Sequence, residues 1–285
     1  MLRNNLKTEN PDLGENELNA QVGRMLQDAD ARTIDVLRRR METLGIKKPV
    51  MQTDGHHDFT IQLSDLTEGI RELVEDVIRH QGVLEFKLVH AQNDELVDTL
   101  LTSGRLPEGY ALSDDGRGFV RIPDWTDFLK DPDYHHRLSL FEVPDPSYTF
   151  MLDRKQNASG QIVYRAVFVN RKAELTGAAV ARATVERDRR SDDTHIALSF
   201  DAEGAKAFAR LTQAYAPRGS QNSDSDEGRQ LAIVMDGILY SAPVIRTEIL
   251  NGQAIIAGFL PNAGTIVCAI LNAGALPVPL RILER

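Results

Sequence analysis

Two pairs of adjacent histidines are the residues whose possible chemistry is easiest to name. His56-His57 lies between Asp54 and Asp58, and a second pair, His135-His136, follows further along the chain. Imidazole and carboxylate groups bind zinc, so a metal-dependent hydrolase using His56, His57 and Asp58 is one hypothesis. Adjacent residues on a strand point to opposite faces, however, so neighbouring histidines seldom bind one ion. We therefore expect no metal site and no cofactor, with the hydrolase as an alternative.

Other catalytic patterns do not occur in the sequence. It has no GxxxxGK[ST] or GxGxxG phosphate loop, no GxSxG elbow and no HExxH zinc motif. The carboxylates of Asp192-Asp193, Asp224, Asp226 and Glu227 lie in polar, loop-like stretches, where solvation is the ordinary reason for charge. We expect a protein that is not an enzyme.

Composition limits the remaining classes of function. The chain has 285 residues, 42% of them hydrophobic, which is enough for one large or two modest domains. Its net charge of −9 argues against a nucleic-acid partner, and the run Arg38-Arg39-Arg40 is expected to be a solvated helix face. The single cysteine, Cys268, allows no intramolecular disulfide. No apolar run is long enough for a membrane span, and the first residues do not resemble a signal peptide.

Aromatic side chains are enriched in the middle of the chain, at Trp125, Phe128, Tyr134 and Phe141. Two interpretations remain open. These residues form the small core of a subdomain, or they form an apolar, adaptable surface that contacts unfolded peptide. They are the candidate peptide-contact residues.

Apolar periodicity predicts two stretches with the same order of elements. A helical pattern from Gly14 precedes the first stretch. The first stretch has a helix at 30–44, strands at 50–53 and 59–63, a helix from Thr67 and a strand at 83–89. The second has a strand at 195–200, a helix from Asp201, the strands at 231–245, a strand at 253–259, a helix from Asn262 and a strand at 277–283. We interpret the shared order of hairpin, helix and strand as an internal repeat, which favours α+β layers of the plait type.

The hairpin at Leu231–Ile245 is the firmest local prediction. Asp236-Gly237 separates two apolar runs, and a type I′ turn needs positive φ at both central residues, which Asp and Gly tolerate best. Pro243 lies inside the second run, where a proline cannot donate to the sheet, so we expect the strand to break there.

The residues between the two stretches are different in kind. From about 91 to 170 prolines and glycines interrupt the pattern, with a short helix expected at 94–101 and strands at 148–152 and 162–170. This segment is predicted to be an inserted subdomain. The stretches 186–193 and 217–228 are expected to be exposed and mobile loops.

Several blocks together resemble one family, SecD, the accessory subunit of the bacterial Sec protein-export machinery. The blocks are RTIDVLRRRMETLGI at 32–46 with Pro49-Val50 and Gln52, LEFKLV at 84–89, LTG at 175–177, FDAEGAKAF at 200–208, the hairpin at 231–245, and GALPVPLR at 274–281. The hairpin carries the marker residues Asp236, Gly237, Ser241, Ala242 and Pro243. Leu63-Ser64-Asp65 departs from the LPG that the family often has, and the inserted segment aligns with no family block.

The resemblance implies the first extracytoplasmic domain of SecD, called P1, with a ferredoxin-like base and an inserted α+β head. The expected divisions are a lead at 1–29, the base at 30–90 and 171–285, and the head at 91–170. The implied hinge lies near His90 and Asp94 and near Val169 and Glu174.

The resemblance also implies the function and location. The domain would lie on the periplasmic side of the inner membrane, contact unfolded preprotein, and meet SecF and the SecYEG channel through membrane segments. The proton-coupling residues of the family lie in membrane helices, so none is assigned here. A purely structural spacer is a further alternative.

Overall fold

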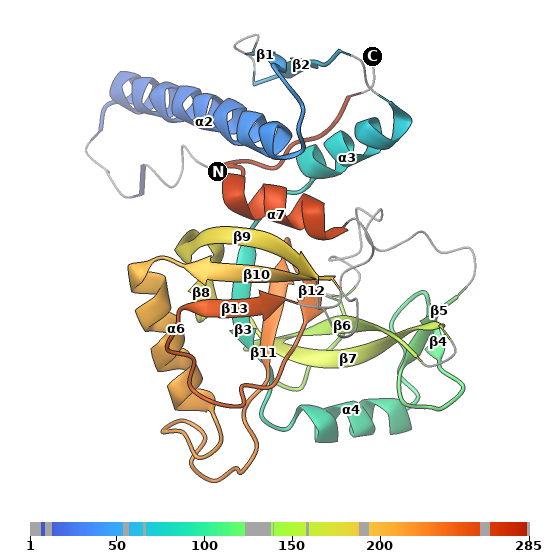
Figure 1. Ribbon diagram of the computed structural model, residues 1–285. Coiled ribbons are helices and arrows are strands. Elements are labelled where there is room, and N and C mark those ends of the chain that lie inside the picture. Colours follow the sequence, from blue (N-terminus) through green and yellow to red (C-terminus); the bar gives the residue numbers. More distant parts are fainter. Residues whose placement is uncertain are drawn as a thin grey trace.

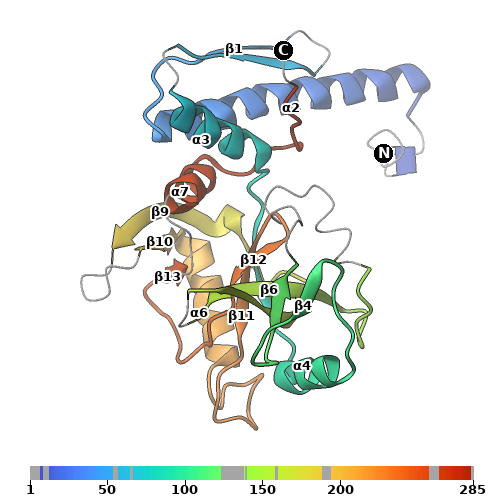
Figure 2. The same ribbon diagram turned by 90° about the vertical axis from the view of Figure 1, so that its right-hand side faces the viewer.

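The protein is a mixed α+β fold. The computed structural model describes residues 7–8, 13–53, 57–64, 67–122, 138, 140–157, 160–187, 194–256 and 263–283. Every strand pair in these residues is antiparallel, and the strands form four sheets. Figures 1 and 2 show two levels, with α2, α3 and the β1–β2 hairpin above α7, and the larger sheets below it. Within the described ranges, no helix combines the length and the apolar character that crossing a membrane requires.

The upper level, which we call the N-terminal layer, consists of four elements. They are α2 (Glu15–Thr43), β1 (Val50–Thr53), β2 (Phe59–Gln62) and α3 (Glu68–Arg79). The sequence predicts separate helical patterns from Gly14 and from residue 30, but α2 is one helix of 29 residues. The segment that joins them has no proline, and one glycine inside a helix costs only about 1 kcal/mol. The helix ends before Gly45, whose φ of 78° is the left-handed cap that the sequence predicts.

Two sheets below α7 enclose the main hydrophobic core. One has the order β12-β11-β3-β8 and the other β13-β10-β9. The bounds are β3 (Leu84–Leu88), β8 (Leu175–Thr176), β9 (Val180–Arg187), β10 (Thr194–Phe200), β11 (Leu231–Met235), β12 (Ile238–Ser241) and β13 (Gln253–Ile256). Helices α6 (Ala202–Tyr215) and α7 (Ala263–Ala273) contribute to this core, and a 3-10 turn at Gly177–Ala179 precedes β9. Phe86 is fully buried at its centre, edge-on to Phe200 and Phe208.

The fourth sheet has the strand order β4-β5-β7-β6, and α4 packs against it. Its bounds are α4 (Asn93–Thr102), β4 (Tyr110–Leu112), β5 (Phe119–Arg121), β6 (Tyr148–Gln156) and β7 (Ile162–Asn170). The predicted short helix and the β6–β7 pair are confirmed. This sheet has a hydrophobic core of its own, centred on Phe119, Phe150 and Phe168. The described residues of this segment therefore pack around a core of their own, and its status as an inserted subdomain stays a prediction.

A third buried cluster joins this subdomain to the main core. Val89, Met151, Val169, Ala232 and Val234 pack together, and an isolated antiparallel bridge links Val89 to Val169. The sheet β12-β11-β3-β8 and the sheet β4-β5-β7-β6 thus contact one another through apolar side chains.

The strand pairing does not show the predicted ferredoxin-like repeat. β3 pairs with β11 and β8, whereas β1 and β2 pair with one another in a separate two-stranded sheet. Four of the five β3 residues are buried, so this strand needs covering on both faces and occupies an interior position. The predicted strand at 277–283 is wrong, because these residues are all described and form no strand.

Candidate functional site

The turn of the β11–β12 hairpin is built as the sequence predicts. Asp236 and Gly237 have φ values of 50° and 76°, both positive as a type I′ turn requires. The Asp236 carboxylate also accepts hydrogen bonds from the backbone nitrogens of Gly82 and Val83, at 2.8 Å each for the shorter contacts. The turn therefore holds the segment that leads from the N-terminal layer into β3, a role that turn propensity alone does not indicate.

Pro243 lies just beyond the end of β12. The strand ends at Ser241, and the chain pairs again through an isolated bridge between Val244 and Gln230. The Pro243 carbonyl oxygen accepts a hydrogen bond from the nitrogen of Leu231 at 2.9 Å. The other two marker residues, Ser241 and Ala242, complete this end of the hairpin. The residues in this hairpin are structural in their contacts.

Arg40 is buried at the joint between the N-terminal layer and the rest of the protein. Its guanidinium donates to the carbonyl oxygens of Val77, His80, Gln81 and Gly274. Val77 lies in the last turn of α3, His80 and Gln81 follow that helix, and Gly274 follows α7. Carbonyl groups at helix C-termini lack helical partners and favour a cation. Burial lowers the pKa of the Arg40 guanidinium to about 10, opposed by the charge of Asp236.

The prediction that Arg38-Arg39-Arg40 is a solvated face is therefore wrong at its last residue. Arg38 and Arg39 are exposed, as predicted, while Arg40 has no exposed surface. The signal that could have found it is its place in the apolar stripe of α2, one residue before the buried Met41 and three after the buried Leu37.

The residues predicted as a hinge lie where β3 and β7 meet. The His90 nitrogen donates to the Phe168 carbonyl at 2.8 Å, and its ring lies edge-on to Tyr148 with 4.5 Å between centroids. Val169 is fully buried. The Glu174 nitrogen donates to the Phe86 carbonyl at 2.8 Å, whereas Asp94 is exposed in the first turn of α4. The structure brings these segments together, and their role as a hinge stays a prediction.

Of the candidate peptide-contact residues, Phe141 alone lies within the described ranges. Its ring stacks on Phe150 with 4.3 Å between centroids, and the Arg105 guanidinium lies 5.4 Å from the ring centre. Phe141 is half-buried and packs against the core of the inserted subdomain. Trp125, Phe128 and Tyr134 fall outside the described residues.

The histidine and aspartate group does not form a metal centre in the described residues. His57 Nδ1 lies 2.9 Å from Asp30 Oδ2 in an ion pair when the ring is protonated, and Asp58 is exposed. His56, His135 and His136 fall outside the described ranges. Elsewhere in these ranges, no three His, Cys, Asp or Glu side chains are grouped so that they could hold an ion.

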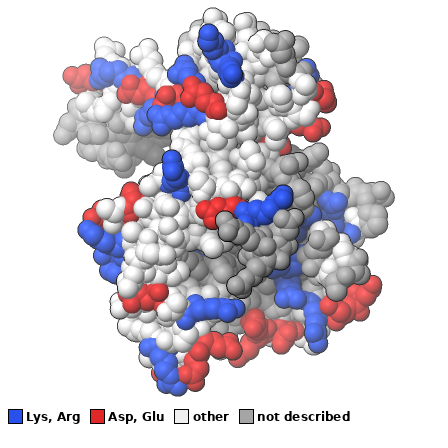
Figure 3. Space-filling model, in the orientation of Figure 1, with Lys and Arg blue, Asp and Glu red and all other residues white. Residues whose placement is uncertain are grey.

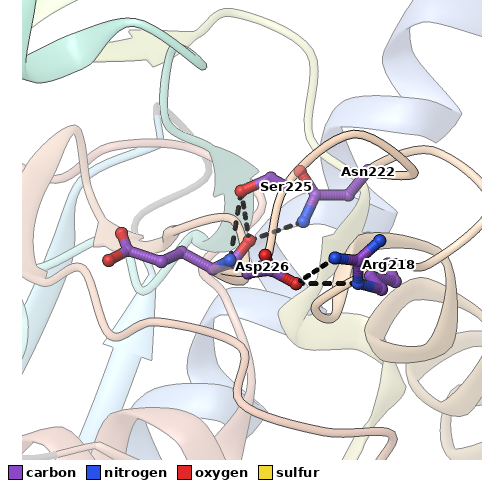
Figure 4. Close-up of polar contacts among 5 residues, drawn as sticks. Arg218, Asn222, Ser225 and Asp226 are labelled. Carbon is purple, nitrogen blue, oxygen red and sulfur yellow. Dashed lines mark hydrogen bonds and ion pairs between the residues drawn. The ribbon is translucent and has the colours of Figure 1, made fainter.

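The loop after α6 was predicted to be mobile, but its described residues are tied together by hydrogen bonds. Arg218 forms an ion pair with Asp226 at 2.7 Å (Figure 4). The Asn222 amide donates to the carbonyls of Ala216 and Glu227, at 3.1 and 2.7 Å. The loop is exposed, as expected, but these contacts give it a defined conformation.

Charges are mixed over the visible face of the molecule. In Figure 3, Lys and Arg side chains alternate with Asp and Glu, and neither sign forms a continuous patch among the coloured residues. This distribution lacks the basic stripe that nucleic-acid binders present.

Two family models match the chain. The one described as the N-terminal part of the P1 domain of protein translocase subunit SecDF covers residues 31–91. The one described as the SecDF P1 head subdomain covers residues 151–278. The chain thus carries both of these parts of a P1 domain. It belongs to the SecD and SecDF family of protein translocase subunits, and the predicted family is confirmed.

The matched ranges differ from the predicted division of the chain. The head-subdomain model begins inside β6 and continues through α7, whereas the sequence predicts a head at 91–170. The division at 90 and 170 stays a prediction. The family is one of transport components and not of enzymes, which removes the hydrolase as an interpretation of His56, His57 and Asp58.

Relatives in other bacteria are similar over most of the chain. Protein translocase subunit SecD of Syntrophobacter fumaroxidans is 30% identical over 93% of this chain and 40% of its own length. SecD of Endomicrobium trichonymphae is 28% identical over 91% of this chain and 47% of its own. SecDF of Thermus thermophilus is 28% identical over 87% of this chain and 26% of its own. The chain thus spans less than half the length of each of these relatives.

Two solved structures share the fold. The crystal structure of SecDF in its super-membrane-facing form superimposes with a TM-score of 0.58 and 23% identity, over 90% of this chain and 28% of the other. A structure of the membrane component SecDF that enhances protein export gives 0.56 and 23%, over 90% of this chain and 92% of the other. At this identity the likeness concerns the fold.

Proposed function

We propose that this chain contacts unfolded preprotein as it emerges from the export channel and so assists export driven by the proton-motive force. The observation that carries the proposal is the family match, because the models of two parts of the P1 domain both match this chain. On this proposal the domain lies on the extracytoplasmic side of the inner membrane. Its partners are the preprotein, SecF and the SecYEG channel, the last two met through the membrane segments of the subunit.

The proposed mechanism is capture and release by differential affinity. A domain with two arrangements of its parts, one of which binds peptide more tightly, can take hold of a chain and release it when the arrangement changes. The energy for the change is supplied outside this chain, since the residues proposed to couple protons lie in membrane helices.

Two joints in the fold are candidates for this motion. The first is the predicted hinge near His90, Asp94, Val169 and Glu174, where the inserted subdomain meets the main core. The second lies between the N-terminal layer and the remainder, where residues 80–83 and 274–276 run side by side. There the Leu276 nitrogen donates to the Gln81 carbonyl at 2.7 Å. The first joint is packed with apolar side chains. The second combines the hydrogen bonds of Arg40 with buried apolar side chains of α2, α3 and α7.

Site-specific crosslinking tests the proposed contact with preprotein. A photoreactive residue replaces Trp125, Phe128 or Tyr134 in the full-length subunit, and an export substrate is stalled in the channel. Leu250, an apolar residue with 74% of its surface exposed, is the matched control position. The proposal predicts adducts with the stalled substrate from the three aromatic positions and none from Leu250.

The purely structural spacer predicts a different result. If neither these positions nor others over the surface of the domain crosslink to the stalled substrate, the domain is a spacer and the proposal is wrong.

A further inference from the structure

A cavity of about 800 Å³ opens within the N-terminal layer. Its walls come from α2, β2, α3 and the C-terminal segment 278–283. Apolar side chains dominate the walls, among them Leu26, Leu37, Phe59, Ile61, Ile78 and Leu280. Figures 1 and 2 show the C-terminal segment passing beside α3 toward the β1–β2 hairpin. We call this cavity the layer groove.

The layer groove lies beside a small packed core, in which Leu18, Leu37, Met41, Val74 and Val77 of α2 and α3 are buried. This core is separate from the three larger buried clusters, which include no side chain of α2, β1, β2 or α3 among the described residues. Phe59 and Ile61 point to the same face of β2 and are only half-buried. Apolar surface left in contact with water favours an apolar partner, because binding removes that surface from water.

An unpaired strand edge borders the layer groove. β2 pairs with β1 in register from Thr53–Phe59 to Val50–Gln62, and the described residues place no strand on its other edge. A hairpin of two strands is marginal in water by itself. Its free edge presents backbone N–H and C=O groups to any extended chain that comes alongside. This backbone edge distinguishes a polypeptide from a lipid chain or a small apolar molecule as the occupant.

The charged groups of the layer groove do not indicate an ionic ligand. Asp30 is buried in the wall and is already paired with His57 at 2.9 Å. Asp58 and Arg281 are exposed at the border, with one charge of each sign. An uncharged, apolar segment fits these walls best.

We infer that the layer groove binds an extended apolar segment of unfolded polypeptide, which adds a strand to the free edge of β2. Alternate side chains of the segment enter the groove, as strand addition requires. This inference rests on the proposed function and adds a contact surface separate from the aromatic residues of the inserted subdomain.

Two charge substitutions on the same strand test the inference. Ile61→Glu places a carboxylate in the groove, and Gln62→Glu places one on the opposite, exposed face of β2. The probe is a fluorescein-labelled, reduced and carboxymethylated protein that stays unfolded, and its binding to the whole 285-residue chain is measured by fluorescence anisotropy. We expect Ile61→Glu to weaken binding by at least about tenfold, because a carboxylate in an apolar site is costly, and Gln62→Glu to bind as the wild type does.

Circular dichroism and thermal melts establish that both variants fold. If Ile61→Glu unfolds the layer, Ile61→Asn replaces it, with Gln62→Asn as the matched control. A photoreactive residue at Leu63, another lining position, gives an independent measurement and should form an adduct with the probe.

The possible results separate this inference from the proposed function. Equal binding by wild type, Ile61→Glu and Gln62→Glu, without an adduct at Leu63, overturns the groove as the site while leaving peptide binding by the domain intact. Failure of the wild type to bind any unfolded probe counts against both. A concentration-dependent dimer that Ile61→Glu abolishes would assign the groove to a second copy of the chain. Binding of the chain to lipid vesicles but not to the unfolded probe, if Ile61→Glu abolishes it, would assign the groove to a membrane surface. Either result overturns the inference.

Discussion

The guanidinium of Arg40 donates a hydrogen bond of 2.9 Å to the carbonyl oxygen of Gly274, 234 residues further along the chain. Gly274 follows α7, and Arg40 belongs to α2, so this contact joins the N-terminal layer to the helix that covers the main core. The same guanidinium binds the carbonyls at the end of α3. One side chain therefore ties three helices together.

Replacing Arg40 should destabilise the protein strongly. Arg40→Ala leaves several buried carbonyl groups without a donor, and we expect the free energy of unfolding to fall by about 3–5 kcal/mol. Arg40→Lys keeps the charge but not the forked donor geometry, so its effect should be intermediate. Urea denaturation measures the change. Arg39→Ala is the control, since the exposed ion pair of Arg39 with Asp35 should contribute no more than about 0.5 kcal/mol. Equal losses of stability in Arg39→Ala and Arg40→Ala would contradict the role of Arg40 as a buried hydrogen-bond donor.

Gly82 and Gly45 form a matched pair of substitutions near this joint. Both have positive φ, 87° and 78°, so alanine is strained at either position by about 1–2 kcal/mol. A Cβ at Gly82 would also lie 2.5 Å from Ile270 Cγ2 and 2.7 Å from Arg40 Nη2, whereas at Gly45 it meets no atom within 4 Å. We expect Gly82→Ala to cost about 1–3 kcal/mol more than Gly45→Ala, as overpacking does. Thermal denaturation followed by circular dichroism compares them, and similar melting temperatures would refute the crowding at Gly82.

Local chemistry explains what could be predicted from the sequence. The Asp236-Gly237 turn, the cap at Gly45 and the paired strands β6 and β7 depend on residues close together in the chain, so their patterns are readable without a structure. The partners of each strand cannot be predicted in this way. β3 pairs with β11, from Leu88–Leu231 to Leu84–Met235, and nothing in either strand alone specifies that choice.

For this reason the predicted repeat is not shown by the strand pairing. Similar element order in 30–90 and 195–283 suggested two similar units, but element order does not determine which strands share a sheet. Arg40 was missed because an arginine beside two others is usually solvated, and its partners are backbone carbonyls, which leave no trace in the sequence. The layer groove was invisible because its walls come from both ends of the chain.

Asp153 should make the stability of the protein depend on pH. It is buried on β6, and its Oδ1 has no hydrogen-bond partner among the described residues. Burial raises the pKa of the Asp153 carboxyl above 3.8. The ammonium of Lys155, whose Nζ lies 3.1 Å from Asp153 Oδ2, lowers this pKa and offsets the effect of burial only in part. The folded chain therefore binds this proton more tightly than the unfolded chain, so the contribution of Asp153 to stability falls as the pH rises through the folded pKa.

Asp153→Asn should consequently raise the free energy of unfolding at about pH 7, with a gain that shrinks as the pH is lowered toward about 4. Urea denaturation at a series of pH values measures it. Asp98→Asn, which changes an exposed carboxylate in α4, is the control and should show no such trend. A loss of stability in Asp153→Asn at neutral pH would mean that the pair with Lys155 outweighs the cost of burial.

Asn222 should hold the loop after α6 in its conformation. Asn222→Ala removes both of the amide hydrogen bonds that cross the loop, and we expect the local opening free energy of residues 216–228 to fall by about 1–2 kcal/mol. Hydrogen exchange of these amides measures it. Ser223→Ala, which removes only an exposed contact to Asp224, is the control. Unchanged exchange in Asn222→Ala would show that these two hydrogen bonds do not hold the loop.

Two engineered disulfides should identify the joint that moves during export. Cysteines at Gln81 and Leu276 would lock the N-terminal layer to the remainder, since the backbone of these residues is hydrogen-bonded at 2.7 Å. Cysteines at Val89 and Val169, which face one another in an antiparallel bridge, would lock the inserted subdomain to the main core. Each pair is introduced into the full-length subunit, and export is followed in cells with and without a reductant. If the N-terminal layer is the part that moves, the 81–276 pair slows export until it is reduced. Slowing by the 89–169 pair alone would instead establish the hinge predicted from the sequence, and normal export with both pairs oxidised would refute motion at either joint.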